Sequence, residues 1–257
     1  MKNKSKFISG IYNYCDRWCE RCAFASRCMN YERNTDLTPE EQDIHSKAFW
    51  NRIGKNFEDA LKLLNKATKD HGIDPDAIPK EELDEHSRKE KKERSEARKH
   101  PLAKITMDYI KKDKQVLEST EAMEEKGNAM IRNFEMGIQA EEDVKKEVDT
   151  IKDCQEIIGW YIHFIHVKFM RAIMGKMEDD GWEEENGYQK DSDGSAKIAM
   201  IGIDRSIEAW TTLVQLVPAL EDNILTLLAM LQKSKRLAEA EFPNARKFIR
   251  PGFDENE

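Results

Sequence analysis

The chain has 257 residues and a formal net charge of −8, because 50 acidic residues outnumber 42 basic ones. This acidic balance argues against non-specific nucleic-acid binding by the molecule as a whole, since the phosphate backbone attracts basic surfaces. Five tryptophans exclude a wholly disordered chain, and the low content of glycine (12) and proline (7) favours helices over strands.

The first segment, residues 1–34, contains four of the five cysteines within fourteen positions: Cys15, Cys19, Cys22 and Cys28. The fifth, Cys154, stands alone in a helical pattern, where a small buried residue is the simplest interpretation. In a reducing compartment, such crowding favours metal ligation over disulfide bonds. The sequence therefore predicts a small N-terminal metal-binding module.

The spacing of the four cysteines bears on which metal they bind. A structural zinc ion needs four ligands around one atom, usually supplied as two pairs separated by a longer loop. A [4Fe–4S] cluster has four separate iron corners, so closely spaced cysteines can wrap around it. We favour the cluster, in a structural or electron-transfer role with an unidentified protein or redox partner, and keep zinc as the alternative.

One run inside this module resembles known cluster-binding sequences. Cys19-Glu-Arg-Cys22-Ala-Phe-Ala-Ser-Arg-Cys28 looks like the C-x2-C-x-F-x3-C run that helps bind [4Fe–4S] in iron–sulfur nucleases of the CRISPR and RecB type. It is also similar to the C-x2-C-x5-C stretch of auxiliary-cluster domains in some radical enzymes. The resemblance implies a [4Fe–4S] cofactor on these three cysteines, and it covers only this run.

The cysteine segment is also basic, with seven Lys and Arg against three acidic residues, and it carries interleaved aromatic side chains. Arg17, Arg21 and Arg27 are candidates for offsetting the negative charge of a thiolate-bound centre. They are equally candidates for contacting nucleic acid. A second hypothesis is therefore a four-cysteine zinc knuckle that binds nucleic acid or protein.

The remainder, residues 35–250, predicts an all-α fold, a bundle of about four to six helices. Thr38 and Pro39 begin a capping box, from which we expect one long helix that ends at Gly72. Residues 74–79 predict a connector. Residues 81–100 are highly charged with almost nothing apolar to bury, so we expect an exposed helix or a linker.

Further helices are expected over 102–123 and 128–177, the second with weak points at Gly137 and Gly159. Residues 178–195 predict an exposed loop, in which Asp193 or Ser195 caps a helix over 196–217. Pro218 either kinks that helix or begins another, and the tail after Phe242 is expected to be irregular.

Polar residues within the apolar helical pattern predict a second polar or metal site. They are Glu156, His163, His166, Asp204 and Glu208. Carboxylates and histidines that project into a bundle build di-iron sites, although the usual Glu-x-x-His pairs are absent here. The alternative is a structural network in which Arg171 or Arg205 pairs with these carboxylates. A third hypothesis is therefore an oxidoreductase with a second metal in the bundle.

The location of the protein is also constrained by hydropathy. The longest uncharged apolar runs, 157–167 and 209–220, are too short to span a bilayer. The N-terminus lacks the apolar region of a signal peptide. We expect a cytoplasmic protein with no membrane contact.

Overall fold

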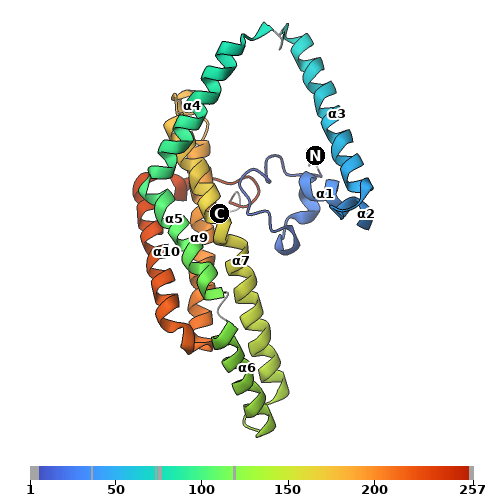
Figure 1. The fold of residues 1–257 in the computed structure, drawn as a ribbon. Helices are drawn as coiled ribbons and strands as arrows, with labels where there is room; N and C mark the ends of the chain where they lie inside the picture. The colour runs from blue at the N-terminus through green and yellow to red at the C-terminus, as the bar shows by residue number, and fades with distance from the viewer. Residues whose placement is uncertain (1–5, 36, 73, 75–76, 118–119, 255–257) are drawn as a thin grey trace, which may run out of the picture. The chain divides into compact units, whose positions relative to one another are not determined.

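The computed structural model describes residues 6–35, 37–72, 74, 77–117 and 120–254. Over these residues the ordered elements are helices and no strand is present (Figure 1), so the all-α prediction is confirmed. Within the described part of the chain, no helix combines the length and apolar character needed to cross a membrane. The chain divides into two compact units, Met1–Lys92 and Glu93–Glu257, while the boundary predicted after residue 34 stays a prediction.

The first unit contains short turns followed by longer helices: η1 (Cys19–Arg21), η2 (Ala25–Arg27), α1 (Met29–Thr35), α2 (Pro39–Gln42), α3 (Lys47–Asp70) and most of α4 (Lys80–Lys99). The predicted capping box at Thr38 is present, with Thr38 Oγ1 accepting from the Glu41 N–H at 3.3 Å. The single long helix was wrong, because α2 ends at Gln42 and Ser46 caps a new helix by accepting from the Phe49 N–H.

The structure also describes the end of α3 and the charged stretch that follows it. Gly72, with φ +64°, follows the end of α3 as expected. Residues 75 and 76 of the predicted connector lie outside the described residues. The charged stretch forms the helix α4, and Pro101 begins the next helix.

The second unit contains α5 (Pro101–Leu117), α6 (Thr120–Glu135), α7 (Glu141–Met177), α8 (Trp182–Glu185), α9 (Asp191–Leu216), η4 (Pro218–Leu220), α10 (Glu221–Glu241) and η5 (Ala245–Lys247). The single helix expected over 128–177 was wrong, because Gly137, with φ +70°, lies in a turn between α6 and α7, whereas Gly159 remains inside α7. Pro218 begins η4 rather than kinking α9. The predicted cap at Asp193 or Ser195 was wrong, because α9 begins at Asp191 and Ser195 is buried within it.

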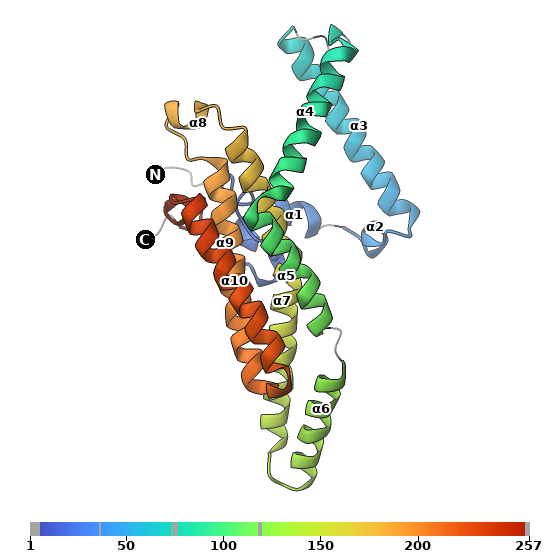
Figure 2. The same cartoon turned by 60° about the vertical axis from the view of Figure 1, so that its left-hand side comes forward.

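Four helices of the second unit form a bundle (Figure 2). α5 packs against α7 and α10, and α9 packs against the same two helices, which closes a ring around one core. Successive helices of this ring run in opposite directions. Large side chains with no more than 1% exposure fill the core, among them Ile158, Phe169, Ile203, Trp210 and Leu227.

The contact between α7 and α9 is the most extensive in the bundle. Gly202 of α9 has no side chain, and a Cβ atom there would lie 3.0 Å from Tyr161 Cδ1 and 3.2 Å from Ile165 Cγ1. At the other end, α7 with 37 residues is longer than α9 with 26, and its N-terminal part extends past the bundle beside α6 (Figures 1 and 2). Near this end Ile131, Phe134 and Ile138 are exposed.

Candidate metal centre

The backbone around the four cysteines forms two short 3₁₀ turns. The Cys22 N–H donates to the Cys19 carbonyl, and the Cys28 N–H donates to the Ala25 carbonyl, both at 3.1 Å. The Ile8 N–H donates to the Arg27 carbonyl at 3.0 Å, so the entry and exit of the segment lie side by side. The chain thus folds back on itself. The first turn begins at Cys19, and Cys28 caps the end of the second.

A left-handed residue shapes the backbone beside the first cysteine. Arg17 has φ +59°, a conformation that non-glycine residues adopt infrequently and that is costly unless the surrounding structure holds it. In this conformation the backbone N–H of Arg17 donates to the Cys15 sulfur and lowers the pKa of the thiol. The Cys15 S–H donates to the Tyr12 carbonyl, with a sulfur–oxygen distance of 3.6 Å.

Electrostatics link all four cysteines. Burial raises the pKa of the Cys15 thiol above its ordinary value, the Arg17 N–H opposes this, and the charge of Cys28 adds to it. Burial also raises the pKa of Cys19, and the negative charges of Cys15, Cys28 and Cys22 each raise it further.

The sulfur atoms are nevertheless not arranged as a formed metal site. Among the described residues, no three or more Cys, His, Asp or Glu side chains are placed closely enough to hold an ion. The four thiols are partly exposed and free, so no disulfide bond occupies them. Four thiolates are the donor set that iron–sulfur clusters and structural zinc take. Their metal binding stays a prediction.

The arginines of the segment differ in their contacts. The Arg21 guanidinium lies over the Trp18 ring, 4.0 Å from its centroid, in a cation–π contact. Arg17 and Arg27 are exposed, as is Arg21. The three candidate arginines therefore present their charge to solvent around the cysteine turns.

The structure does not bring the five residues of the predicted second site together as metal ligands. Glu156, His163 and Glu208 are exposed. His166 is half-buried, and its Nδ1 atom lies 2.9 Å from Thr106 Oγ1. The oxidoreductase hypothesis stays a prediction without a geometric basis in the described residues.

Asp204 belongs to an ion-pair network instead. Its carboxylate accepts from Lys235 Nζ at 2.7 Å and from Arg246 Nη1 at 2.9 Å. Of the arginines proposed from the sequence, Arg171 binds Asp191 and Arg205 donates to the Tyr161 hydroxyl. The observed partners come from α10 and the tail, which spacing along one helix cannot reveal.

A buried polar group in the bundle escaped the sequence analysis. Asp113 of α5 has 0% exposure, and neither carboxylate oxygen has a hydrogen-bond partner among the described residues. Burial raises the pKa of Asp113 to about 7. One turn earlier, the Tyr109 hydroxyl accepts from Trp210 Nε1 at 3.0 Å, and burial together with the charge of Asp113 raises the pKa of Tyr109. The signal in the sequence was an Asp within the apolar stripe of a helix.

Comparisons with protein-family models, with curated proteins and with solved structures each found no match for this chain. The resemblance to iron–sulfur nucleases and auxiliary-cluster domains therefore extends no further than the spacing of three cysteines. The chemistry of the side chains themselves carries the functional argument.

Proposed function

We propose that Cys15, Cys19, Cys22 and Cys28 bind a [4Fe–4S] cluster, which stabilises the N-terminal segment or transfers one electron. The observation that carries this proposal is the spacing of four free cysteines within fourteen residues of one short, turn-rich segment. One thiolate for each of four iron corners suits four cysteines in close succession.

The small amount of buried surface in this segment supports a metal centre. Among residues 6–32, only Ile11 is buried, and the ordered elements are two three-residue turns and the start of α1. Segments of this size rarely fold on a hydrophobic core alone and usually need disulfides or a metal. The cysteines here are free thiols, and a metal bound by them would stabilise the segment.

Proton release follows from the raised thiol pKa values. Cys15 and Cys19 have pKa values above the ordinary value for a thiol, so both are protonated at neutral pH in the metal-free chain. A bound cation stabilises the thiolates and displaces these protons. Metal binding therefore weakens as the pH falls, and the Arg17 N–H helps to orient the Cys15 thiolate.

Anaerobic purification with metal and sulfide analysis tests the proposal. We expect brown protein with roughly four iron and four sulfide per chain. Replacing each of Cys15, Cys19, Cys22 and Cys28 by Ser should lower the iron content, whereas Cys154→Ser is the matched control and should leave it unchanged. Protein that stays without iron after anaerobic reconstitution would refute the cluster.

A zinc knuckle that binds nucleic acid or protein is the second candidate, favoured by the exposed arginines and by the Arg21–Trp18 contact. Colourless protein with one zinc per chain would select it over the cluster. Its affinity for single-stranded RNA should then fall in Arg21→Ala and Arg27→Ala and depend on salt, while Arg236→Ala on α10 provides a matched loss of charge. Equal affinities in all three variants would reject nucleic-acid binding.

A further inference from the structure

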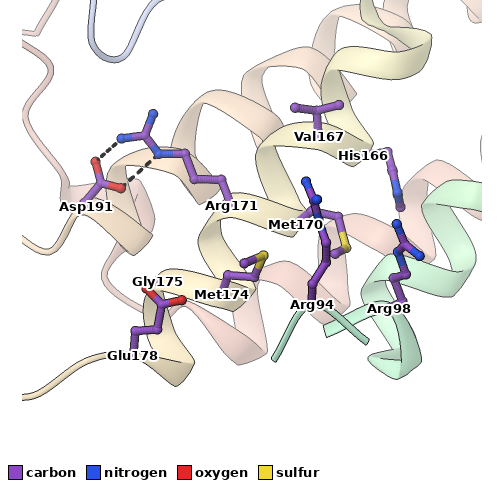
Figure 3. Close-up of a pocket in the computed structure, with 10 residues that line it drawn as sticks. All are labelled: Arg94, Arg98, His166, Val167, Met170, Arg171, Met174, Gly175, Glu178 and Asp191. Atoms are coloured by element: carbon purple, nitrogen blue, oxygen red, sulfur yellow. Dashed lines mark hydrogen bonds and ion pairs between the residues drawn. The ribbon is translucent and has the colours of Figure 1, made fainter. Parts of the chain in front are cut away.

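A cavity of about 560 Å³ lies between α7 and the last turns of α4, wholly within the second unit (Figure 3). One face of α7 lines it with His166, Val167, Met170, Met174 and Gly175. Its volume is in the range of small-molecule sites. The buried Ala97 anchors this part of α4, so the wall of the cavity has a fixed support.

The charged side chains of the cavity are three arginines, Arg94, Arg98 and Arg171, and two acids, Glu178 and Asp191. Arg94 and Arg98 project from α4 one helical turn apart toward α7. Arg171 is already bound to Asp191 through two hydrogen bonds, of 3.0 Å from Nε and 2.8 Å from Nη2. Within the described part of the chain, neither Arg94 nor Arg98 makes a hydrogen bond or ion pair. Two guanidinium groups are therefore available to an anion.

His166 contributes a third polar group of defined orientation. The Thr106 hydroxyl oxygen lies 2.9 Å from the Leu102 carbonyl, 3.1 Å from the Ala103 carbonyl and 2.9 Å from His166 Nδ1. When its single proton is donated to a carbonyl, the oxygen accepts from the Nδ1–H of His166. This leaves Nε2 with a lone pair in the neutral ring, and protonation makes it a donor. Burial, and then the charges of His163 and Arg98, lowers the pKa of His166, so a bound anion would reverse part of this effect.

The apolar part of the cavity comes from Val167, Met170 and Met174. Val167 is 60% exposed, so the cavity opens to solvent at this residue. Methionine side chains are flexible and polarizable, which lets them adapt to ligands of different shape. A site with free guanidinium groups on one side and thioethers on the other complements a molecule with both an acid group and a hydrocarbon part.

We propose that this cavity binds a small amphiphilic anion, an organic carboxylate or phosphate. Its acid group binds Arg94 and Arg98 of α4, and its apolar chain lies on Met170 and Met174 of α7. A bidentate contact suits both acids, because the guanidinium fork matches carboxylate and phosphate oxygens. This site is independent of the cysteine centre.

Calorimetric titration of the full chain tests this site, with decanoate and decyl phosphate below their micelle concentrations. At least one acid should saturate one site per chain, and the difference between the two identifies the preferred head group. Decanol, which lacks the charge, and inorganic phosphate, which lacks the chain, should each bind at least about tenfold more weakly. Decanol that binds as tightly as decanoate would overturn the proposal.

Single substitutions locate the binding. Arg94→Ala and Arg98→Ala should each weaken the tighter acid by about tenfold or more, because each removes a charged hydrogen bond. Arg88→Ala on the same helix is the matched control, since Arg88 lies outside the cavity and donates to the Asp84 carbonyl. Val167→Glu, at an exposed position, should abolish binding through charge repulsion. Effects no larger than that of Arg88→Ala would refute the site.

A spectroscopic readout distinguishes this cavity from non-specific binding. On titration with the acid, the ring resonances of His166, assigned with His166→Asn, should shift and its pKa should rise. The exposed His86 on α4 lies outside the cavity, and its resonances should not move. Equal shifts at His86 and His166 would show general association with the protein surface and reject the proposal. Circular dichroism of each variant confirms that the fold is intact.

Discussion

The ionisation of Asp113 should make the stability of the bundle depend on pH. This carboxyl has 0% exposure and no hydrogen-bond partner among the described residues, and burial raises its pKa from 3.8 to about 7. A group whose native pKa is raised in this way holds its proton in the folded state after the unfolded chain has released it. Stability must therefore fall as the pH rises from about 4 to about 7, and stay level above that.

The size of this effect follows from the pKa difference. One unit corresponds to about 1.4 kcal/mol, so a rise of about three units costs the native state about 4 kcal/mol once Asp113 is ionised. About 3 kcal/mol of this loss falls between pH 5 and pH 8. Asp113→Asn removes the ionisation while keeping a similar shape, so the variant should escape this loss.

Urea unfolding at pH 5 and pH 8 measures the prediction. The free energy of unfolding of the native chain should fall by about 3 kcal/mol more than that of Asp113→Asn over this range. Asp108→Asn is the matched control, because Asp108 lies on the same helix and its side chain is 63% exposed. If the native chain and Asp113→Asn change equally with pH, Asp113 does not ionise in this window and the argument from burial fails.

Two further predictions concern other contacts of the second unit. Gly202→Ala should destabilise the bundle by about 1–3 kcal/mol, because the new Cβ would meet Tyr161 and Ile165, whereas Gly159→Ala has nothing within 4 Å and should stabilise α7 by up to about 1 kcal/mol. Urea unfolding measures both, and equal effects would contradict the close approach of α7 and α9. Asp254→Asn should cost about 2 kcal/mol at pH 7, because hydrogen bonds from Arg250 and Lys197 outweigh burial and hold the pKa of Asp254 well below its usual range. This cost is present above pH 4 and is lost as the pH falls through the native pKa, so a cost that is unchanged at pH 2 would contradict it.

Local signals in the sequence predicted some helix starts correctly, but they did not predict how long each helix is. The capping box at Thr38 was correct, but Ser46 offered a second cap that periodicity alone did not reveal. The sequence analysis named both Gly137 and Gly159 as weak points of one expected helix. Only Gly137 has a positive φ, because a turn there lets α6 and α7 pack together, while the packing of α7 on α9 keeps the helix continuous through Gly159.

The candidate sites differ in the same way, because some have residues that are close in sequence and others have residues that come from different helices. The four cysteines could be singled out from the sequence because they lie close together in it. The cavity was missed because Arg94 and Arg98 lie in a stretch that reads as a solvated helix, and His166 and Met170 face them from another helix. The partners of Asp204 likewise come from residues 31 and 42 positions away.

The N-terminal part of α7 extends past the bundle (Figure 2), so the two ends of this helix should differ in how easily they open locally. Along its C-terminal part, α7 is held by α5 and α9, so separating it there would expose the whole core to water. Along its N-terminal part, α6 is the neighbour drawn beside it (Figure 2), and side chains at the tip such as Ile131 and Ile138 are already in solvent. The hairpin of α6 and α7 can thus fray and reclose while the bundle remains intact.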